Sequence, residues 1–349
     1  MSSEKKHPYK NLANSKFWSS VRNEEFLVDL FKPKFTINTQ DKIATAGSCF
    51  AQNITKLLRN SDCNLLDYEQ PPKDLPEFLY TKYGYKMFSC RYGNIYTVAS
   101  LVQLLKEAFN IKNYNYEVWK NENENFCDPS RPNITEGGFD TLEELNYNRT
   151  IHLEEVKRLF SNLDIFIFTL GLTESWMNIE DGFVFPIAPG VIAGRYNKTN
   201  HAFKNFTYNE IISDFEEFVS ILQSVNKNFK ILLTVSPVPL AATASDKNVL
   251  YSTIHSKSIL RSVCSYLYEK HEFIDYFPSF EIFCNPWSSE DYYEDNRRDV
   301  SAEGVEVAMN LFFSSFKLKL IKHESEQKPN PNDEKFDTVC EEEILNLKR

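Results

Sequence analysis

The sequence contains no long apolar run. Its most apolar stretch, residues 163–172, is only as long as a strand, whereas a helix that crosses a bilayer needs about 20 apolar residues. Residues 1–7 are mostly polar or charged and lead into more polar sequence, without the apolar core of a secretory signal. We therefore expect no membrane span, and the cytosol is the expected location.

Cysteine is scarce and scattered. The chain has 7 cysteines, an odd number, and no two of them form a Cys-x-x-Cys pair. In a chain of this length they indicate reduced thiols, and not a disulfide framework or a zinc site. The sequence also lacks a P-loop, the glycine motif of dinucleotide-binding folds and a His-Glu-x-x-His pair. We expect no nucleotide cofactor and no metal.

Positive charge is in the minority. The 39 Lys and Arg residues against 49 Asp and Glu residues give a formal net charge of -10. Proteins that bind nucleic acid usually carry a basic field, so the charge argues against a nucleic-acid partner. Hydrophobic residues make up 42% of the 349 residues and aromatic residues 14%, which is enough for a globular domain with a sizeable core.

Apolar strands and amphipathic helices alternate along the chain. Short buried strands are predicted at residues 43–46, 164–170, 231–235 and 273–276. Apolar residues at helical spacing predict helices around residues 50–58, 101–109, 211–222, 259–267 and 302–318. This alternation is typical of a parallel sheet covered by helices on both faces. The expected fold class is α/β, with three α/β/α layers and a mostly parallel central sheet.

The chain divides into one domain with an arm and a tail. Residues 1–40 are expected to wrap on the domain as an arm, which residues 41–322 form. Within that domain, residues 111–150 are rich in Asn and Glu and are expected to be a long loop or insertion. Residues 323–349 are polar and predict a flexible acidic tail, with a short helix at 340–347. The arm's expected anchors are Phe17, Trp18, Phe26, Leu27 and Phe31.

Three loops that follow predicted strands are candidates for a functional site. In a parallel sheet, functional groups gather where the strands end. Residues 47–51, Gly-Ser-Cys-Phe-Ala, would place Ser48 at a helix N-terminus, where backbone N–H groups can hold a developing oxyanion. The alternative is that Ser48 merely caps the helix. The other two loops, residues 171–176 and 234–240, are each compatible with ordinary turns.

The sequence resembles the GSCFA family, whose name residues 47–51 spell and which is similar to the SGNH/GDSL hydrolases. Other segments carry the resemblance in order, from about residue 8 to residue 318. They are residues 8–12, 17–18, 91–97, 168–176, 185–190, 234–240, 256–261 and 276–281. The resemblance implies an SGNH-hydrolase-like fold that acts on an acyl ester, with carbohydrate as the acylated partner and polysaccharide biosynthesis as a setting.

The resemblance also implies roles for particular residues. Ser48 would be the nucleophile, and Gly93 matches the glycine that helps to hold the oxyanion. Thr173 stands where the SGNH pattern has an oxyanion-binding asparagine, and it could still donate one hydrogen bond. For substrate binding, the resemblance implies Asn94, Glu174 and Trp176. It implies no cofactor.

The final block of the pattern departs from the family. An Asp-x-x-His pair normally precedes the last helix, but here Asn296 and Asp299 have that spacing and residues 295–304 contain no histidine. A carboxylate is a weaker base than imidazole, and loss of general-base assistance costs about 10²–10⁴-fold in rate. The candidates for the base are His201, His255 and Asp299, and a chain with no effective base is the remaining alternative.

Two functions stay open on this basis. One is an ester hydrolase or O-acyltransferase that forms an acyl-enzyme on Ser48, with the Ser48 and Gly93 N–H groups holding the oxyanion. The other is a degenerate domain that binds a glycan or a protein partner without turnover. A third hypothesis takes Cys49 as the reactive group, because a thiol at a helix N-terminus can have a lowered pKa.

Overall fold

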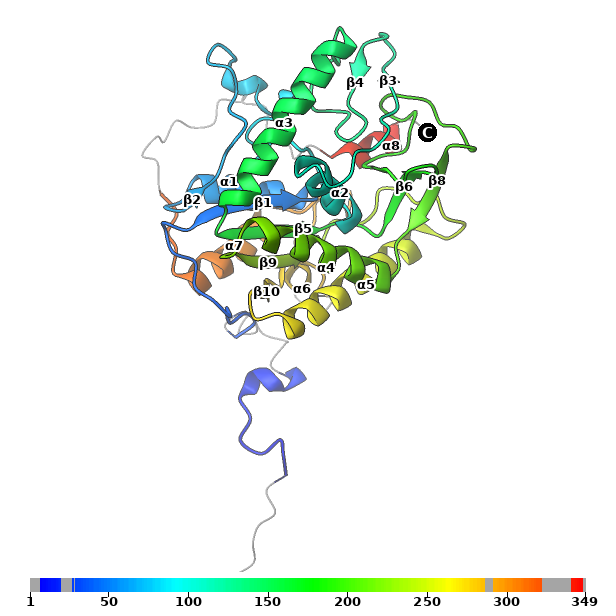
Figure 1. Ribbon diagram of the computed structural model, residues 1–349. Coiled ribbons are helices and arrows are strands. Elements are labelled where there is room, and N and C mark those ends of the chain that lie inside the picture. Colours follow the sequence, from blue (N-terminus) through cyan, green and yellow to red (C-terminus); the bar gives the residue numbers. More distant parts are fainter. Residues whose placement is uncertain (1–6, 20–26, 28, 286–290, 322–339, 348–349) are drawn as a thin grey trace, which may run out of the picture.

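A five-stranded parallel sheet forms the centre of the protein. The computed structural model describes residues 7–19, 27, 29–285, 291–321 and 340–347. The strands lie in the order β10-β9-β5-β1-β2, and each neighbouring pair is parallel (Figure 1). They are β1 (Lys42–Gly47), β2 (Asn64–Leu65), β5 (Ile165–Leu170), β9 (Lys230–Val235) and β10 (Ile274–Tyr276). The predicted strands therefore lie in one parallel sheet, as expected.

Helices cover both faces of this sheet. One face carries α2 (Val98–Ala108), α3 (Leu142–Asn162), α4 (Tyr208–Val225) and α5 (Val249–Lys270). The other carries α1 (Phe50–Arg59), α6 (Ser279–Phe283) and α7 (Ala302–Phe316). The three-layer α/β/α arrangement is thus confirmed. Within the described residues, no helix is long and apolar enough to cross a membrane.

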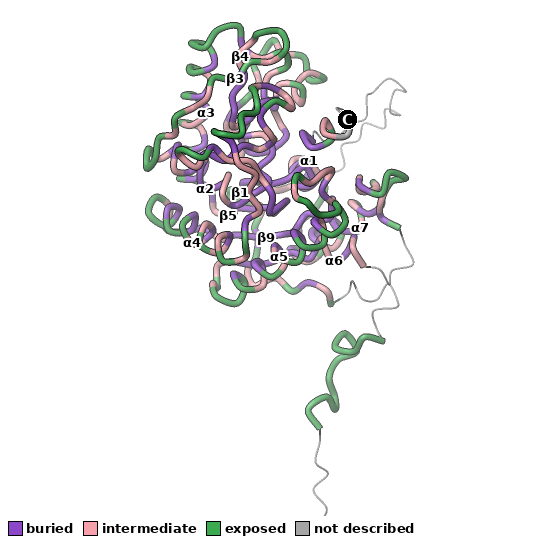
Figure 2. The backbone as a smooth tube through the Cα atoms, turned by 90° about the vertical axis from the view of Figure 1, so that its right-hand side faces the viewer, coloured by how far each residue is buried: buried purple, intermediate pink, exposed green. Residues whose placement is uncertain are grey.

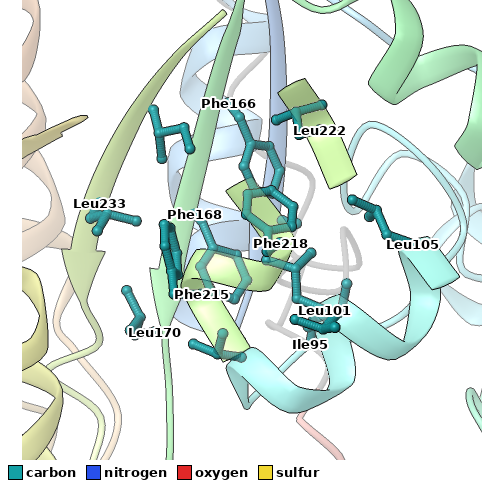
Figure 3. Packing of buried hydrophobic residues seen from close by; sticks show 14 of the residues in the cluster. Ile95, Leu101, Leu105, Phe166, Phe168, Leu170, Phe215, Phe218, Leu222 and Leu233 are labelled. Atoms are coloured by element: carbon teal, nitrogen blue, oxygen red, sulfur yellow. The ribbon is translucent and has the colours of Figure 1, made fainter. Parts of the chain in front are cut away.

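Strand β5 shows why the central strands are apolar throughout. Successive side chains of a strand point to opposite faces, and both faces here are covered. Phe166 and Phe168 pack with α2 and α4, whereas Ile165 and Ile167 pack on the opposite side (Figure 3). All six residues of β5 are buried, and Figure 2 shows buried backbone through the sheet with exposed backbone at the periphery.

Two small sheets extend the domain. One is antiparallel, with the order β7-β6-β8, and the other is the hairpin β3-β4. The strands are β3 (Trp119–Lys120), β4 (Phe126–Cys127), β6 (Glu174–Asn178), β7 (Val184–Phe185) and β8 (His201–Asn205). The segment 111–150, expected to be a long loop or insertion, is not a loop throughout, because it contains the hairpin β3-β4 and the start of α3. Helix α3 begins there at Leu142, because the Thr141 hydroxyl caps it by accepting from the Glu144 N–H.

Both ends of the chain differ from the expectation. In the arm, Leu27 and Phe31 pack on the core, whereas Phe17 and Trp18 are 40% and 59% exposed. The fifth expected anchor, Phe26, lies outside the described residues. Of the tail, residues 323–339 and 348–349 also lie outside them. Residues 340–347 are not a flexible tail, because they form a 3₁₀ helix, η6 (Glu341–Glu343), and helix α8 (Ile344–Leu347), with Cys340, Glu341 and Glu342 buried.

We predict that Phe168→Ala lowers the free energy of unfolding by about 3–5 kcal/mol, because the substitution leaves a cavity between β5 and α4. Urea unfolding followed by circular dichroism measures the change. Tyr147→Ala is the control, since Tyr147 is 69% exposed and its loss should cost about 0.5 kcal/mol or less. Equal losses in the two variants would contradict the packing described here.

Candidate active site

Gly47 and Ser48 end strand β1 in close contact with β5. The Ser48 N–H donates to the Thr169 carbonyl at 3.2 Å, and Gly47 has a φ of 138°. A Cβ atom at position 47 would lie 2.4 Å from that same carbonyl oxygen, so only glycine fits there. One sequence-based expectation is corrected here. The Ser48 N–H already has a partner, so it does not point to an oxyanion.

The Ser48 side chain is buried and unbonded. Ser48 is 2% exposed, and its Oγ has no hydrogen-bond partner among the described residues. Helix α1 starts two residues later at Phe50, with no side-chain cap. The alternative that Ser48 caps the helix is therefore wrong. A buried hydroxyl without a partner costs free energy and calls for an explanation such as catalysis.

Residues 95, 96 and 171 lie next to the Gly47–Ser48 turn. The Ile95 N–H donates to the Gly47 carbonyl at 2.8 Å, and the Tyr96 carbonyl accepts from the Gly171 N–H at 3.1 Å. A Cβ atom at Gly171 would lie 2.9 Å from the Ser48 Cβ. These bonds hold the loop with Gly93 across the carboxyl ends of β1 and β5. The Gly93 N–H has no hydrogen bond to another described residue, and its role as an oxyanion donor stays a prediction.

Thr173 is the second unbonded hydroxyl. It is fully buried, its N–H donates to Ser256 Oγ at 3.0 Å, and its Oγ1 has no partner among the described residues. Thr169 Oγ1, at the end of β5, is also buried without a partner among the described residues. No contact joins Thr173 to Ser48 directly within the described part of the chain, so their convergence on one substrate stays a prediction.

The three residues predicted to bind substrate have different surroundings. Asn94 Oδ1 accepts from Gln52 Nε2 on α1 at 2.9 Å, which ties Asn94 to the helix that follows Ser48. Glu174 is buried and accepts from the Thr243 hydroxyl at 3.0 Å, and burial raises the pKa of its carboxyl. Trp176 lies on β6 with its ring against Tyr196 and Phe203. Of the three, only Asn94 is bonded to an element that begins beside Ser48.

His201 is occupied elsewhere. Its Nδ1 accepts from the Asn197 N–H at 3.0 Å, and its Nε2 lies 2.7 Å from Glu117 Oε1. The ring also packs on Phe185 and Tyr196. None of these contacts involves the Ser48 loop, so the structure gives His201 a role in holding the small antiparallel sheet. The other histidine candidate, His255, is exposed on α5 and stacks on Tyr251.

In the final block, the side chain that points toward the carboxyl end of the central sheet is that of Arg298, and not that of Asp299. Asp299 Oδ2 accepts from Asn296 Nδ2 at 2.6 Å, and its side chain is 46% exposed. The Arg298 side chain is 11% exposed and donates to Cys340 Sγ at 3.2 Å. We find no support for Asp299 as the base, because its carboxylate faces its own loop.

Lys257 is the functional candidate that the sequence did not reveal. Its Nζ, deep in the core, donates to the Gly171 carbonyl at 2.8 Å, and burial lowers its pKa to about 8. Gly171 is the residue whose Cα faces Ser48. The signal was available, because Lys257 shares the inward face of α5 with Leu260 and Cys264, three and seven residues on. A lysine on a buried helix face indicates a specific partner.

Cys49 does not fit the description of a reactive thiol. It is buried, and its hydrogen bond to Cys340 together with burial raises its pKa well above the usual range. The same bond lowers the pKa of Cys340. The hypothesis of Cys49 as nucleophile is therefore contradicted, since the nucleophile would have to be the thiolate.

The buried cluster Glu69, Cys90 and His152 offers metal-ligand atoms within 4.8 Å of one another. Arg131 lies 3.8 Å from Glu69, and Glu69 already bonds His152 and the Arg91 N–H. A cation beside this carboxylate disfavours a metal ion.

Residues 42–312 match the GSCFA family. The chain belongs to the GSCFA family. The matched region spans β1 to α7 and so includes both Ser48 and Arg298. A search of curated proteins gave no match.

Solved structures show distant likenesses. A protein assigned as a platelet activating factor from Streptococcus pneumonia has 12% identity and a TM-score of 0.28, over 50% of this chain and 67% of that one. A salicylyl-acyltransferase from a tetracycline biosynthetic pathway has 13% identity and a TM-score of 0.26, over 47% and 40%. A family 3 carbohydrate esterase from Talaromyces cellulolyticus has 10% identity and a TM-score of 0.26, over 63% and 89%.

We predict that Glu342 makes stability pH-dependent. Burial raises the pKa of Glu342 from 4.5 to about 7. The positive charges of Arg298 and Lys257 lower the pKa, and the negative charge of Glu341 raises it further. Between pH 4.5 and about pH 7, the folded state therefore binds more protons at Glu342 than the unfolded state does. Its contribution is fully present below pH 4.5 and is lost as the pH rises through about 7.

The measurement is the free energy of unfolding of the wild type minus that of Glu342→Gln, which stays neutral at every pH. This difference should fall by about 3 kcal/mol between pH 4.5 and pH 8. The exposed Glu306→Gln is the control and should show a flat difference. A flat difference for Glu342→Gln as well would refute the buried state of this carboxyl.

Proposed function

We propose that this GSCFA protein is a serine acyl-ester hydrolase or O-acyltransferase that acts on an acylated carbohydrate and forms its acyl-enzyme on Ser48. One observation carries the proposal. Ser48 Oγ is buried, with no hydrogen-bond partner in the described part of the chain, at the carboxyl end of a central parallel strand and directly before a helix. That is where α/β proteins place reactive groups. Hydrolysis and transfer differ only in whether water or a sugar hydroxyl takes the acyl group.

The reaction follows the general scheme of covalent acyl transfer. Ser48 Oγ attacks the carbonyl carbon, and its proton passes to a base. The carbonyl oxygen becomes an oxyanion, which the Gly93 N–H and the Thr173 hydroxyl stabilise in this scheme. The intermediate then expels the alcohol, which takes the proton from the base, and the acyl group remains on Ser48 until an acceptor removes it.

Lys257 is our candidate for the base. In its neutral form, Lys257 Nζ can accept a proton, and a pKa of about 8 leaves part of the population neutral near physiological pH. Lys257 Nζ donates to the carbonyl of Gly171, and Gly171 lies against the Ser48 side chain, which supports this choice. It replaces His201 and Asp299, because those side chains bond elsewhere.

A catalytically degenerate domain that binds a glycan or a protein is the second candidate. The 2% exposure of Ser48 and the arginine in the final block favour it. The two candidates differ in one observable, which is turnover that depends on Ser48.

We predict that Ser48→Ala reduces turnover of p-nitrophenyl acetate to the uncatalysed background. Lys257→Met should lower kcat/KM by about 10²–10⁴-fold, and wild-type kcat/KM should rise with pH through about 8 as the lysine loses its proton. Asp299→Asn is the control and should keep wild-type kinetics.

If the wild type and Ser48→Ala have equal rates, the binding domain replaces the enzyme. If turnover depends on Ser48 while Lys257→Met leaves the pH profile unchanged, the nucleophile stands and the base is another group.

A further inference from the structure

The segment Cys340–Leu347 is bound at the candidate active site, although α7 ends far before it at Phe316. The segment is drawn in red in Figure 1. Its three consecutive buried residues are a cysteine and two glutamates, Cys340, Glu341 and Glu342. Burying two carboxyl groups is costly unless specific partners receive them. The partners therefore decide what the segment does.

The Glu341 side chain contacts the loop that carries Gly93, the predicted oxyanion glycine. Its Oε2 accepts from Asn94 Nδ2 at 2.5 Å and from the Tyr96 hydroxyl at 2.7 Å. Its Oε1 is 3.9 Å from where a Cβ on Gly93 would lie. A carboxylate thus lies beside Gly93 and on Asn94, the residues expected to meet the acyl group and the substrate.

Glu342 faces the buried cations of the site. Its Oε2 accepts from Arg298 Nη2 at 3.3 Å, and its charge also attracts Lys257. Glu343 adds a second carboxylate, with Oε1 at 3.3 Å from Arg298 Nη1. Removing one partner of a buried ion pair leaves an uncompensated charge, which is strongly unfavourable. When the segment leaves, the carboxylate that remains beside Arg298 among the described residues is Asp299, at 3.5 Å, so a ligand with an anionic group could replace the lost partners.

These contacts indicate which segment fills the site, and they indicate that a ligand with a carboxylate could replace it. A segment that only stabilised the fold would bury apolar side chains, whereas this one offers carboxylates to polar groups of the site. We propose that Cys340–Leu347 is an internal ligand that slows access to Ser48, because the site is open for only part of the time, and that the substrate which displaces it best is an acyl ester carrying a carboxylate. The inference rests on the proposed function for its substrate, but the position of the segment can be tested without turnover.

The thiol pair Cys49–Cys340 provides the means to test it. The two thiols are near enough for each to shift the pKa of the other, and one lies directly after Ser48 while the other lies on the segment. Diamide can oxidise such a pair: the two thiols lose two electrons and two protons to its N=N bond and form one disulfide, and diamide becomes the hydrazine. The disulfide would hold the segment in its place over the site.

In the first experiment, the full chain is treated with diamide and the linked peptides are mapped by mass spectrometry. A serine-directed phosphonate then reports access to Ser48. We expect a Cys49–Cys340 link, at least about tenfold slower labelling of Ser48, and recovery with dithiothreitol. Cys340→Ser is the matched control, because it keeps the glutamates but cannot form the link, and diamide should leave its labelling rate unchanged.

The second experiment measures the ligand class without catalysis. Succinate is titrated into the full-length Glu341→Ala/Glu342→Ala variant and into the wild type by isothermal titration calorimetry. The variant should bind at least about tenfold more tightly, because its site lacks the internal carboxylates, and Arg298→Gln in the variant background should abolish binding. Glu306→Ala is the control for loss of an exposed glutamate and should behave as the wild type does.

The outcomes separate the two ideas. A disulfide that forms without slowing the labelling, or equal succinate binding by the variant and the wild type, overturns the internal ligand. If the link forms and the variant alone binds succinate while no form is labelled at Ser48, the internal ligand stands and the proposed esterase fails.

Discussion

The close approach of β1 and β5 at Gly47 is the constraint on which the site depends. The absence of a side chain at this position lets the Ser48 N–H reach the Thr169 carbonyl, and a Cβ atom there would collide with that carbonyl. The same two strand ends receive the Ile95 and Tyr96 bonds that fix the loop of Gly93. One glycine thus sets the position of the candidate nucleophile, its neighbouring strand and the loop opposite it.

Buried charge is the second feature that organises this end of the sheet. Lys257 and Arg298 come from α5 and from the loop before α7, and both lie in the interior. Arg298 pairs with Glu342 and Glu343, which come from a distant part of the chain, and the charge of Glu342 also acts on Lys257. Such an arrangement stabilises little by itself, since desolvation offsets the attraction. We infer that Lys257 and Arg298 form a binding site for an anion, and that the carboxylate of Glu342 takes the place of that anion.

The sequence predicted most of the fold because apolar periodicity is a local signal. The strands around Phe168 and Leu232 are apolar on both faces, and only a sheet covered on both sides buries such strands. The prediction failed where tertiary contacts decide, as in the short end segment, whose acidic composition looked like a solvated tail. Its carboxyl groups are buried only because Asn94 and Arg298 receive them, and no local pattern shows those partners.

The candidate site was predicted in part. Ser48 follows a strand and precedes a helix, so its position could be derived, and Gly93 and Thr173 came from the family resemblance. The base could not be found this way, because spacing in the final block pointed to Asp299 while the side chain that turns inward is Arg298. Lys257 was overlooked, since a helix face is assigned from its apolar residues and one lysine among them is easily passed over.

The central claim is that Ser48 becomes acylated. The most direct measurement is the intact mass and peptide map of the protein after brief incubation with p-nitrophenyl acetate and an acid quench. We predict a single added acetyl group on the peptide that contains Ser48, absent in Ser48→Ala. Acetyl groups only on lysines or cysteines, unchanged in that variant, would contradict it.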